Sequence, residues 1–254
     1  MFESGLVSVS FRGLPIEDII EQTALVGLSC IEWGGDVHLP PNDVELAHQV
    51  AKRTQSAGLR VSSYGSYFRI GINPIRQFAD VLATASALGT KLVRVWAYDR
   101  YLSEWTGPVW DSLVESARMI AEMAAKAGIT VCLECHNRTL TEEYRSALCF
   151  LQAVDHPALR MYWQPNEHRS HAYNLESARA LAPYTECIHV FHWDAQGHYP
   201  LSKGIWEWKA YLAIFCERLP TKALPLLLEF MPDNKVESLP AEAETLKRLI
   251  DVMR

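Results

Sequence analysis

Four polar residues stand at or near the ends of short apolar segments, where side chains able to do chemistry are unusual. They are Glu134, Gln164, His189 and Glu229. Two carboxylates, an imidazole and an amide oxygen are ligand types that together suit a divalent metal ion. A carboxylate in a buried strand also needs a partner or a metal, because desolvating an unpaired charge is costly. The residue types therefore indicate a metal site or, as the simpler alternative, a hydrogen-bonded polar cluster.

The elements that must position these residues repeat one unit of helix, break and short apolar strand. Gly27, Gly58, Gly89 and Gly128 each separate a helical pattern from an apolar run, as expected for left-handed helix caps. The predicted strands are residues 6–11, 28–33, 59–64, 90–97, 129–136, 159–164, 187–193 and 224–230. The predicted helices are residues 15–25, 44–56, 75–88, 109–126, 142–154, 175–181, 209–219 and 241–253.

Strands that alternate with helices pair in parallel through right-handed crossovers. Eight such units in 254 residues predict an α/β fold, a single (β/α)8 TIM barrel domain over residues 1–254. A doubly wound open sheet is the alternative, but it usually has fewer strands and a glycine-rich first turn. The first turn here, residues 10–15, holds one glycine, which favours the barrel.

Alternation along the strands gives the direction of the four polar side chains. Val131 takes the face toward the helices, and this turns Glu134 inward. The same argument turns Gln164, His189 and Glu229 inward at the ends of the next three strands. Because the C-terminal ends of barrel strands meet at one mouth, where catalytic residues gather, we expect the four side chains to converge.

Two nearby motifs carry less weight. Cys132 and Cys135 spell Cys-x-x-Cys, but residues three apart on a strand point to opposite faces, so a zinc ribbon is not expected. His192 has the same spacing from His189, and we expect it at the rim of the mouth or behind the metal ligands. The sequence has neither the Gly-x-Ser-x-Gly motif of serine hydrolases nor a Gly-x-x-x-x-Gly-Lys-Ser/Thr phosphate loop.

Composition excludes several partners and locations. The net charge is −6 and no run of Lys or Arg occurs, which argues against a nucleic acid partner. No apolar run approaches the roughly 18 residues of a membrane span, and residues 1–6 do not resemble a secretory signal. Six cysteines scattered among apolar segments are typical of free thiols in a reducing compartment. We therefore expect a cytoplasmic protein without a membrane partner; a homo-oligomer remains open.

Six segments of the chain resemble the sugar phosphate isomerase/epimerase superfamily, whose barrels are xylose isomerase-like. The resemblance covers nearly the whole chain and depends on the order and spacing of these segments. They are residues 27–38, 133–137, 162–165, 188–194, 200–208 and 227–230.

The resemblance implies a metal ion, often Mn²⁺ with Mg²⁺, Co²⁺ or Zn²⁺ as alternatives, bound by Glu, Asp, His and Glu from strands five to eight. The matching residues are Glu134, Gln164, His189 and Glu229. Gln164 departs from the usual Asp, so the site loses one negative charge and its affinity for a hard cation should fall. Many relatives also have a substrate-binding His three residues after that Asp, where this chain has Glu167 followed by His168.

The resemblance further implies a sugar isomerase or epimerase that acts on a sugar, keto-sugar or sugar derivative. Glu134 and Glu229 would be both metal ligands and the acid/base pair that moves a proton next to a carbonyl, through an enediolate. Nine further residues are candidates for binding the small-molecule substrate through polar or aromatic groups. They are Glu32, His38, Tyr64, Arg94, Trp96, His136, Asn137, His168 and Lys203.

Alternatives remain for these residues and for the function. Tyr64 and Trp96 could simply pack the barrel, and Arg94 could pair with Glu32. A lyase or dehydratase acting on a keto-sugar or inositol derivative, or a non-catalytic protein, is compatible with a weakened metal site at Gln164. A phosphodiesterase like endonuclease IV is less favoured, because strands two to four lack the additional His and Asp ligands that it needs.

Overall fold

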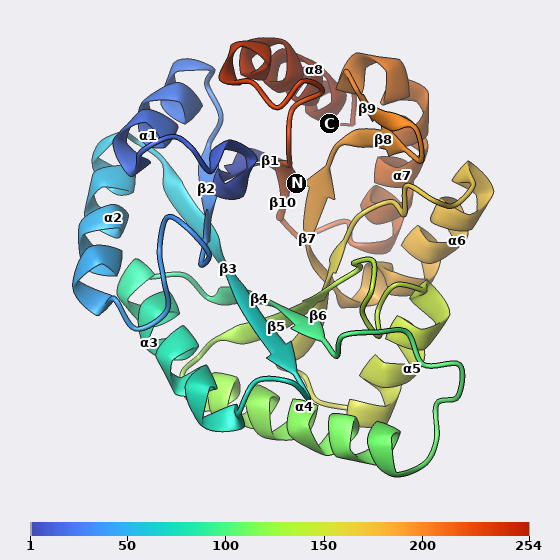
Figure 1. Ribbon diagram of the computed structural model, residues 1–254. Coiled ribbons are helices and arrows are strands. Elements are labelled where there is room, and N and C mark those ends of the chain that lie inside the picture. The colour runs from blue at the N-terminus through green and yellow to red at the C-terminus, as the bar shows by residue number, and fades with distance from the viewer. Residues whose placement is uncertain (1, 254) are drawn as a thin grey trace.

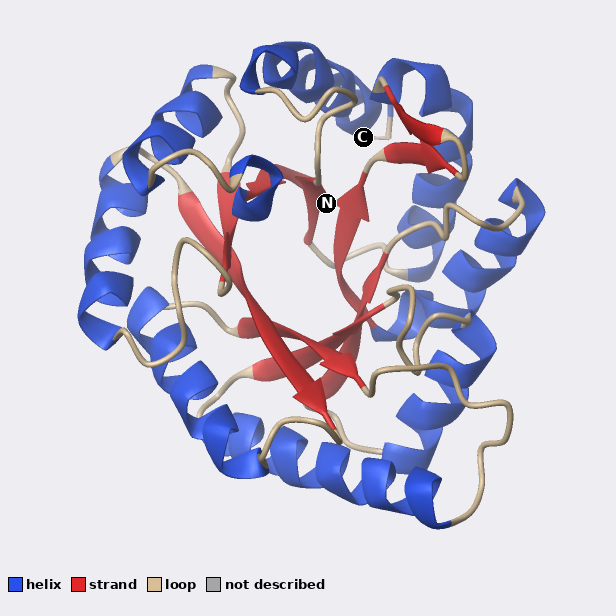
Figure 2. Cartoon of the chain, in the orientation of Figure 1, coloured by secondary structure: helices blue, strands red, loops and turns tan. Residues whose placement is uncertain are grey.

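A computed structural model describes residues 2–253 of the chain and shows a closed barrel of parallel strands surrounded by helices (Figures 1 and 2). The strands neighbour one another in the order β1-β10-β7-β6-β5-β4-β3-β2, and β2 returns to pair with β1. The barrel strands are β1 (Phe2–Val7), β2 (Cys30–Gly34), β3 (Arg60–Ile70), β4 (Leu92–Ala97), β5 (Thr130–Glu134), β6 (Leu159–Trp163), β7 (Thr185–Val190) and β10 (Leu224–Leu228). The predicted (β/α)8 barrel is therefore confirmed.

Eight α-helices form the outer ring, each after one barrel strand. They are α1 (Ile16–Leu25), α2 (Val44–Ser56), α3 (Phe78–Leu88), α4 (Pro108–Lys126), α5 (Tyr144–Val154), α6 (His171–Leu181), α7 (Ile205–Arg218) and α8 (Leu239–Val252). Short 3₁₀ helices are η1 (Ser8–Phe11), η2 (Ile75–Gln77), η3 (Ala182–Tyr184), η4 (Leu201–Gly204) and η5 (Val236–Ser238). The four glycines predicted as helix caps all have φ near +70°, a conformation that costs glycine little.

The barrel strands have an apolar layer on each face, one toward the helices and one inside the barrel. The large layer, between strands and helices, includes Val131, Ile188 and Leu228. The small layer fills the barrel interior beneath the mouth. It consists of Val7, Val9, Cys30, Cys132, Tyr162, Cys187 and Leu227. This division follows the alternation expected for β5, β6, β7 and β10, so each of these strands turns one polar residue into the mouth.

The first strand begins earlier than predicted. Residues 2–7 form β1, whereas residues 8–11, predicted as strand, form η1. Gly5 is not a break before the strand but lies within it, opposite Leu227 of β10. A Cβ at Gly5 would lie 2.5 Å from Leu227 Cδ2 and 2.6 Å from Cys30 Sγ. Glycine is needed there because three strands approach closely inside the barrel.

The seventh and eighth predicted strands also end earlier than expected. β7 ends at Val190, and the chain then leaves the barrel to form an antiparallel hairpin of β8 (His192–Asp194) and β9 (Gly197–Tyr199). β10 ends at Leu228, and Phe230 has φ +51°. The Phe230 ring packs against the inner layer and Trp193, whereas strand alternation from Leu228 would turn it toward the helices.

All six cysteines are free, as predicted. Within residues 2–253, no helix combines the length and hydropathy needed to cross a membrane.

Candidate metal centre

The four predicted ligands meet around one nitrogen atom, Nδ1 of His189. Gln164 Oε1 lies 3.0 Å from this atom, Glu229 Oε2 lies 3.3 Å away and Glu134 Oε1 lies 3.5 Å away. Ligand atoms of Glu134, His189 and Glu229 all lie within 4.8 Å of one another. The strands β5, β6, β7 and β10 thus bring together the four side chains that alternation had turned inward.

The spacing and charge of the cluster fit a divalent cation. Adjacent ligands of an octahedral ion, bound at about 2.1 Å, are about 3.0 Å apart, close to the separations around His189 Nδ1. The buried carboxylates Glu32, Glu134 and Glu229 carry three negative charges, and the buried Arg94 offsets one of them. When His189 is neutral, as a metal ligand must be, two negative charges remain and would balance one divalent ion, which gives this group of residues a physical reason to be buried together.

Glu134 uses its two oxygens differently. Its Oε2 accepts hydrogen bonds from Arg94 Nη1 and Trp96 Nε1, each at 2.6 Å. Its Oε1 is the oxygen that faces His189. Burial alone would raise the pKa of Glu134, but the guanidinium of Arg94, followed by His189, holds it well below its usual range. Glu134 is therefore a fixed carboxylate with one oxygen directed to the cluster.

Glu32 lies behind His189 and is fully buried. Its Oε2 accepts a hydrogen bond from Ser63 Oγ at 2.8 Å and lies 3.6 Å from His189 Nε2. Its Oε1 accepts from Arg94 Nε at 3.3 Å. A Cβ at Gly65 would lie 2.5 Å from this same oxygen, so a glycine on β3 makes room for the carboxylate.

His189 is surrounded by acids on both ring nitrogens. Burial would lower its pKa, but Glu229, Glu134 and Glu32 outweigh that effect and raise it well above the usual value. Its Nε2 is nevertheless a buried atom without a hydrogen bond in the described residues, as is the hydroxyl of Tyr162 beside it. The imidazole is held by the Gln164 contact at Nδ1 and by the surrounding carboxylates.

Besides Glu32, four of the predicted substrate-binding residues lie around the cluster at the mouth. Trp96 contacts Glu134, and its ring centroid lies 5.0 Å from that of His136. Asn137 donates a hydrogen bond to Glu167, at the position where the resemblance implies a histidine. Arg94 pairs with both Glu32 and Glu134 and is 3% exposed, so its charge is directed to these acids.

The structure does not bring Tyr64 and His38 to the cluster. The Tyr64 ring packs in the layer between strands and helices, and its hydroxyl donates to Leu39 O at 2.9 Å. A register shift between β2 and β3, at Ile31/Glu32, changes the alternation that sequence reading assumed. His38 lies in the loop after β2, where both ring nitrogens contact protein oxygens, Ser8 Oγ at 3.1 Å and Leu14 O at 3.2 Å.

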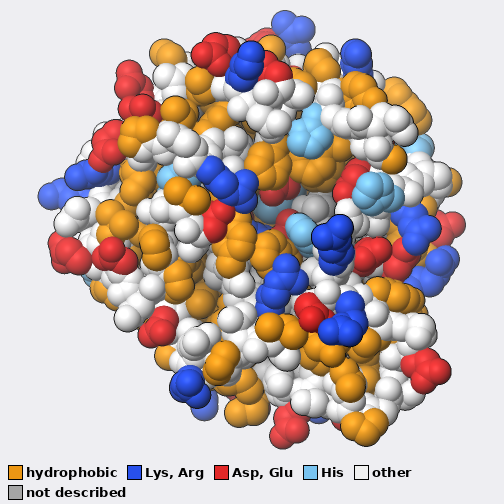
Figure 3. All heavy atoms as spheres, in the orientation of Figure 1, with side chains coloured by type: hydrophobic (Ala, Val, Ile, Leu, Met, Phe, Trp, Pro, Cys, Tyr) orange, Lys and Arg blue, Asp and Glu red, His pale blue; other side chains and the backbone are white. Residues whose placement is uncertain are grey.

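His168 and Lys203 lie farther out. The His168 side chain is 55% exposed and lies 3.5 Å from Glu167, while Lys203 Nζ lies over the ring of Tyr199 on the hairpin. Figure 3 shows acidic and histidine side chains at the bottom of a hollow near the centre of this face. His192, predicted near the rim, lies on β8 beyond the end of β7, and its Nδ1 lies 3.3 Å from Glu207 Oε2.

Sequence reading missed Ser63, Gly65 and an aromatic wall at the mouth. In this wall, Trp193 stacks on Phe191 at 3.8 Å and on His198 at 4.3 Å, and Phe230 lies against the same group. The spacing of Trp193 and His198 on either side of the Asp194–Gly197 turn was the available signal, since residues paired across a hairpin share a face.

Comparisons with known proteins agree with this architecture. A family model, the xylose isomerase-like TIM barrel, matches residues 20–249. A 3-dehydroshikimate dehydratase of Bacillus anthracis is 25% identical over 199 residues, 72% of this chain and 69% of the relative.

Two solved structures show the same fold at lower identity. A crystal structure of a probable 3-DHS dehydratase involved in petrobactin synthesis, from Bacillus anthracis, superposes with a TM-score of 0.79 and 22% identity, over 97% of this chain and 99% of that one. The structure of an L-ribulose 3-epimerase superposes with a TM-score of 0.77 and 16% identity, over 100% and 96% of the two chains. Because the family match spans most of the sequence, the chain belongs to the xylose isomerase-like TIM barrel family.

Proposed function

We propose that this protein is a metal-dependent enzyme that removes a proton next to a carbonyl group of a sugar, keto-sugar or sugar derivative, as an isomerase or epimerase. The observation that carries the proposal is the convergence of three oxygens, from Glu134, Gln164 and Glu229, on Nδ1 of His189. Such a cluster of unlike ligands at the C-terminal mouth of a barrel is suited to catalysis.

The residues that would hold the ion are Glu134, Gln164, His189 and Glu229, with Mn²⁺ as the proposed ion. When bound, it would supply Lewis acidity toward a carbonyl oxygen and the neighbouring hydroxyl. Glu32 would position His189: a proton on Nε2 would face the Glu32 carboxylate and leave the Nδ1 lone pair directed at the cluster. Arg94 and Ser63 in turn fix the orientation of Glu32.

The contacts of the two glutamates suit them unequally to proton transfer, because among residues 2–253 only Glu229 keeps a free oxygen. Glu134 has one oxygen facing the cluster and the other held by Arg94 and Trp96. Glu229 contacts His189 through Oε2, which leaves its Oε1 for a substrate proton. In the proposed reaction, Glu229 takes the proton from carbon, the electron pair of that C–H bond forms the enediolate, and a proton then returns to carbon. For an epimerase, Glu134 is the candidate for the opposite face.

A dehydratase is the second candidate, and the different contacts of Glu134 and Glu229 favour it. Elimination needs a base on one side of the substrate, and Glu229 alone can be that base. The electron pair left by the proton forms a carbon–carbon double bond, and the hydroxyl group on the next carbon leaves as water with the proton that Glu229 has taken up. The dehydratase relative that is 25% identical to this chain supports keeping this candidate.

The test combines metal analysis with substrate screening in heavy water. We expect about one divalent ion per chain after exposure to Mn²⁺, and deuterium incorporation into ketoses or keto-sugar derivatives that stops when the ion is removed with EDTA and resumes when it is restored. An isomerised or epimerised product supports the first candidate, and a conjugated ketone that absorbs in the ultraviolet supports the second. No bound metal, together with no change in melting temperature on adding Mn²⁺, would exclude both.

A further inference from the structure

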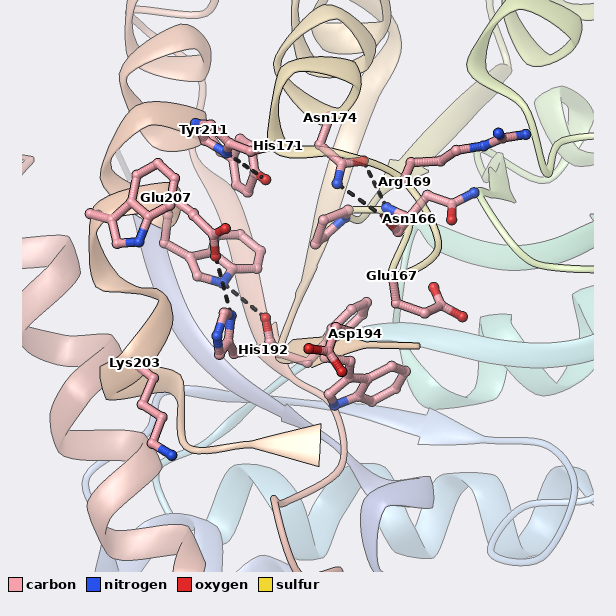
Figure 4. Close-up of a pocket in the computed structure, with 15 residues that line it drawn as sticks. Asn166, Glu167, Arg169, His171, Asn174, His192, Asp194, Lys203, Glu207 and Tyr211 are labelled. Carbon is pink, nitrogen blue, oxygen red and sulfur yellow. Dashed lines mark hydrogen bonds and ion pairs between the residues drawn. The ribbon is translucent and has the colours of Figure 1, made fainter. Parts of the chain in front are cut away.

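A second hollow adjoins the mouth, beside the proposed ligands Gln164 and His189. It is a pocket of about 340 Å³ between the N-terminal ends of α6 and α7 and the β8–β9 hairpin (Figure 4). Its wall includes Pro165, which directly follows Gln164, and Phe191, two residues after His189. Consecutive Cα atoms are 3.8 Å apart, so the pocket begins within roughly 8 Å of chain from the proposed metal ligands.

The walls of this pocket are fixed by contacts of its own. Trp208 Nε1 donates to Phe191 O at 2.9 Å, and His171 Nδ1 lies 3.0 Å from the hydroxyl of Tyr211. His192 Nδ1 lies 3.3 Å from Glu207 Oε2. A Cβ at Gly204 would lie 2.4 Å from that same nitrogen, so the glycine makes room for the imidazole. The pocket is therefore a shaped site and not a gap between mobile loops.

The charges around the pocket do not suit an anion. Its lining includes three carboxylates, Glu167, Asp194 and Glu207, against two cations, Lys203 and Arg169. Arg169 pairs with Glu143, which does not line the pocket. With acids in excess, a phosphate would be repelled, whereas hydroxyl groups can both donate to the carboxylates and accept from histidine and lysine.

Trp206 gives the pocket an exposed aromatic face. The residue is 61% exposed although tryptophan is usually much more buried, and its ring centroid lies 4.5 Å from that of His171 at the pocket wall. An indole presented beside carboxylates and imidazoles combines a surface for the C–H face of a ring with partners for its hydroxyl groups.

We propose that this pocket binds a second hydroxylated ring, so that the substrate is a glycoside or another compound in which a sugar ring is linked to the reacting unit. The inference depends on the proposed function, because it makes the pocket the distal part of the same substrate site. A pocket of this size can take one ring but not a long chain. The reacting unit would lie at Glu229, and the linked ring would lie against Trp206.

The test measures sugar binding before it measures catalysis. The probes are glucose, methyl glucosides and a set of glucose disaccharides of α and β linkage, with binding followed by calorimetry and by ligand-observed NMR. We expect at least one disaccharide to bind about tenfold more tightly than glucose, and Trp206→Ala to remove that advantage. The control is Met119→Ala, which removes another exposed large side chain, from α4. Both variants should bind Mn²⁺ as the unchanged protein does.

Two outcomes would overturn the pocket assignment. One is that no disaccharide binds better than glucose, or that Trp206→Ala leaves the difference intact. The other is that inorganic phosphate binds and displaces the sugars, which would make the pocket an anion site. Disaccharide binding by a protein that takes up no metal would refute the proposed function alone and leave the pocket assignment standing.

Discussion

The barrel has two halves that satisfy their buried polar groups in different ways. We call β1–β5 with the loops that follow them the paired half, and β6, β7 and β10 the open half. On β1–β5 and the loops that follow them, the groups pair with one another: Glu32 with Ser63 and Arg94, and Glu134 Oε2 with Arg94 and Trp96. On β6 and β7, two buried polar atoms, the Tyr162 hydroxyl and His189 Nε2, have no hydrogen bond among residues 2–253. The oxygens of Gln164 and Glu229 converge beside them.

This difference in hydrogen bonding indicates that one half supports the site and the other half carries its chemistry. Buried polar groups are normally hydrogen-bonded, so unpaired ones indicate strain, an unfilled requirement or a functional role. In the paired half, the buried polar groups bind one another and form a rigid support. In the open half, they remain available to an ion or a substrate. Glu134 lies at the boundary, because one oxygen belongs to each half.

The largest effect should come from replacing the two cluster glutamates. Glu134 lies at the boundary of the two halves, and Glu229 lies in the open half. We expect Glu134→Gln and Glu229→Gln each to lower turnover by about 10³-fold, since each removes a proposed ligand and a group for proton transfer. Glu134→Gln should also lower the free energy of unfolding by about 3 kcal/mol, because it breaks a buried ion pair with Arg94. Glu229→Gln should cost less stability, because an amide oxygen can still face His189 Nδ1 in place of Glu229 Oε2.

Deuterium exchange into substrate and denaturant unfolding without added metal measure the two effects. Glu242→Gln is the matched control: this buried carboxylate accepts a hydrogen bond from Leu201 N, on η4, and burial raises its pKa. It should leave exchange intact. Equal losses of stability in both cluster variants would contradict the division between the halves, and near-normal activity of Glu229→Gln would refute the proposed proton transfer.

A smaller effect is expected at Gln164, the position where the resemblance implies an aspartate. Gln164→Glu keeps the length of the side chain and adds a negative charge to the open half of the site. Affinity for Mn²⁺ should rise about tenfold, because ligand charge strengthens binding of hard cations. Calorimetric titration measures the change, and Gln152→Glu on the exposed face of α5 is the control for added charge. Unchanged affinity would mean that Gln164 does not bind the ion.

The open half was the part that could be predicted from the sequence. Glu134, Gln164, His189 and Glu229 lie at the ends of short apolar strands, where a period of two sets their direction. The pairing of β6 with β7 also shifts register, at Met161/Tyr162, but this shift lies before Gln164 and His189 and leaves their direction unchanged. The glycine caps before the strands set the element boundaries in the same local way. Local rules were sufficient because the side chains converge through the symmetry of the barrel.

The paired half could not be predicted as well, because its geometry depends on contacts between strands. The register shift between β2 and β3 at Ile31/Glu32 changes the alternation, and so it turns Tyr64 out and Ser63 toward Glu32. A second shift, between β3 and β4, follows at Gly65/Arg69. The space that Gly65 leaves for Glu32 likewise exists only after the strands pair. The β8–β9 hairpin and the first turns of α6 and α7 were also missed, and they form the second pocket.

The smallest predicted effect tests whether His38 belongs to the paired half. Burial lowers the pKa of His38, and its two ring nitrogens contact Ser8 and Leu14. Because the folded protein favours the neutral ring, this stabilisation is complete above the unfolded pKa of about 6.5 and is lost as the pH falls through the lower folded value. His38→Gln, which cannot be protonated, should therefore lose less stability than the unchanged protein between pH 7.5 and pH 5. Unfolding by denaturant at each pH measures this, with His48→Gln on the exposed face of α2 as the control. If both variants lose as much stability between pH 7.5 and pH 5 as the unchanged protein, the neutral form of His38 does not stabilise the fold. His38 would then not belong to the paired half.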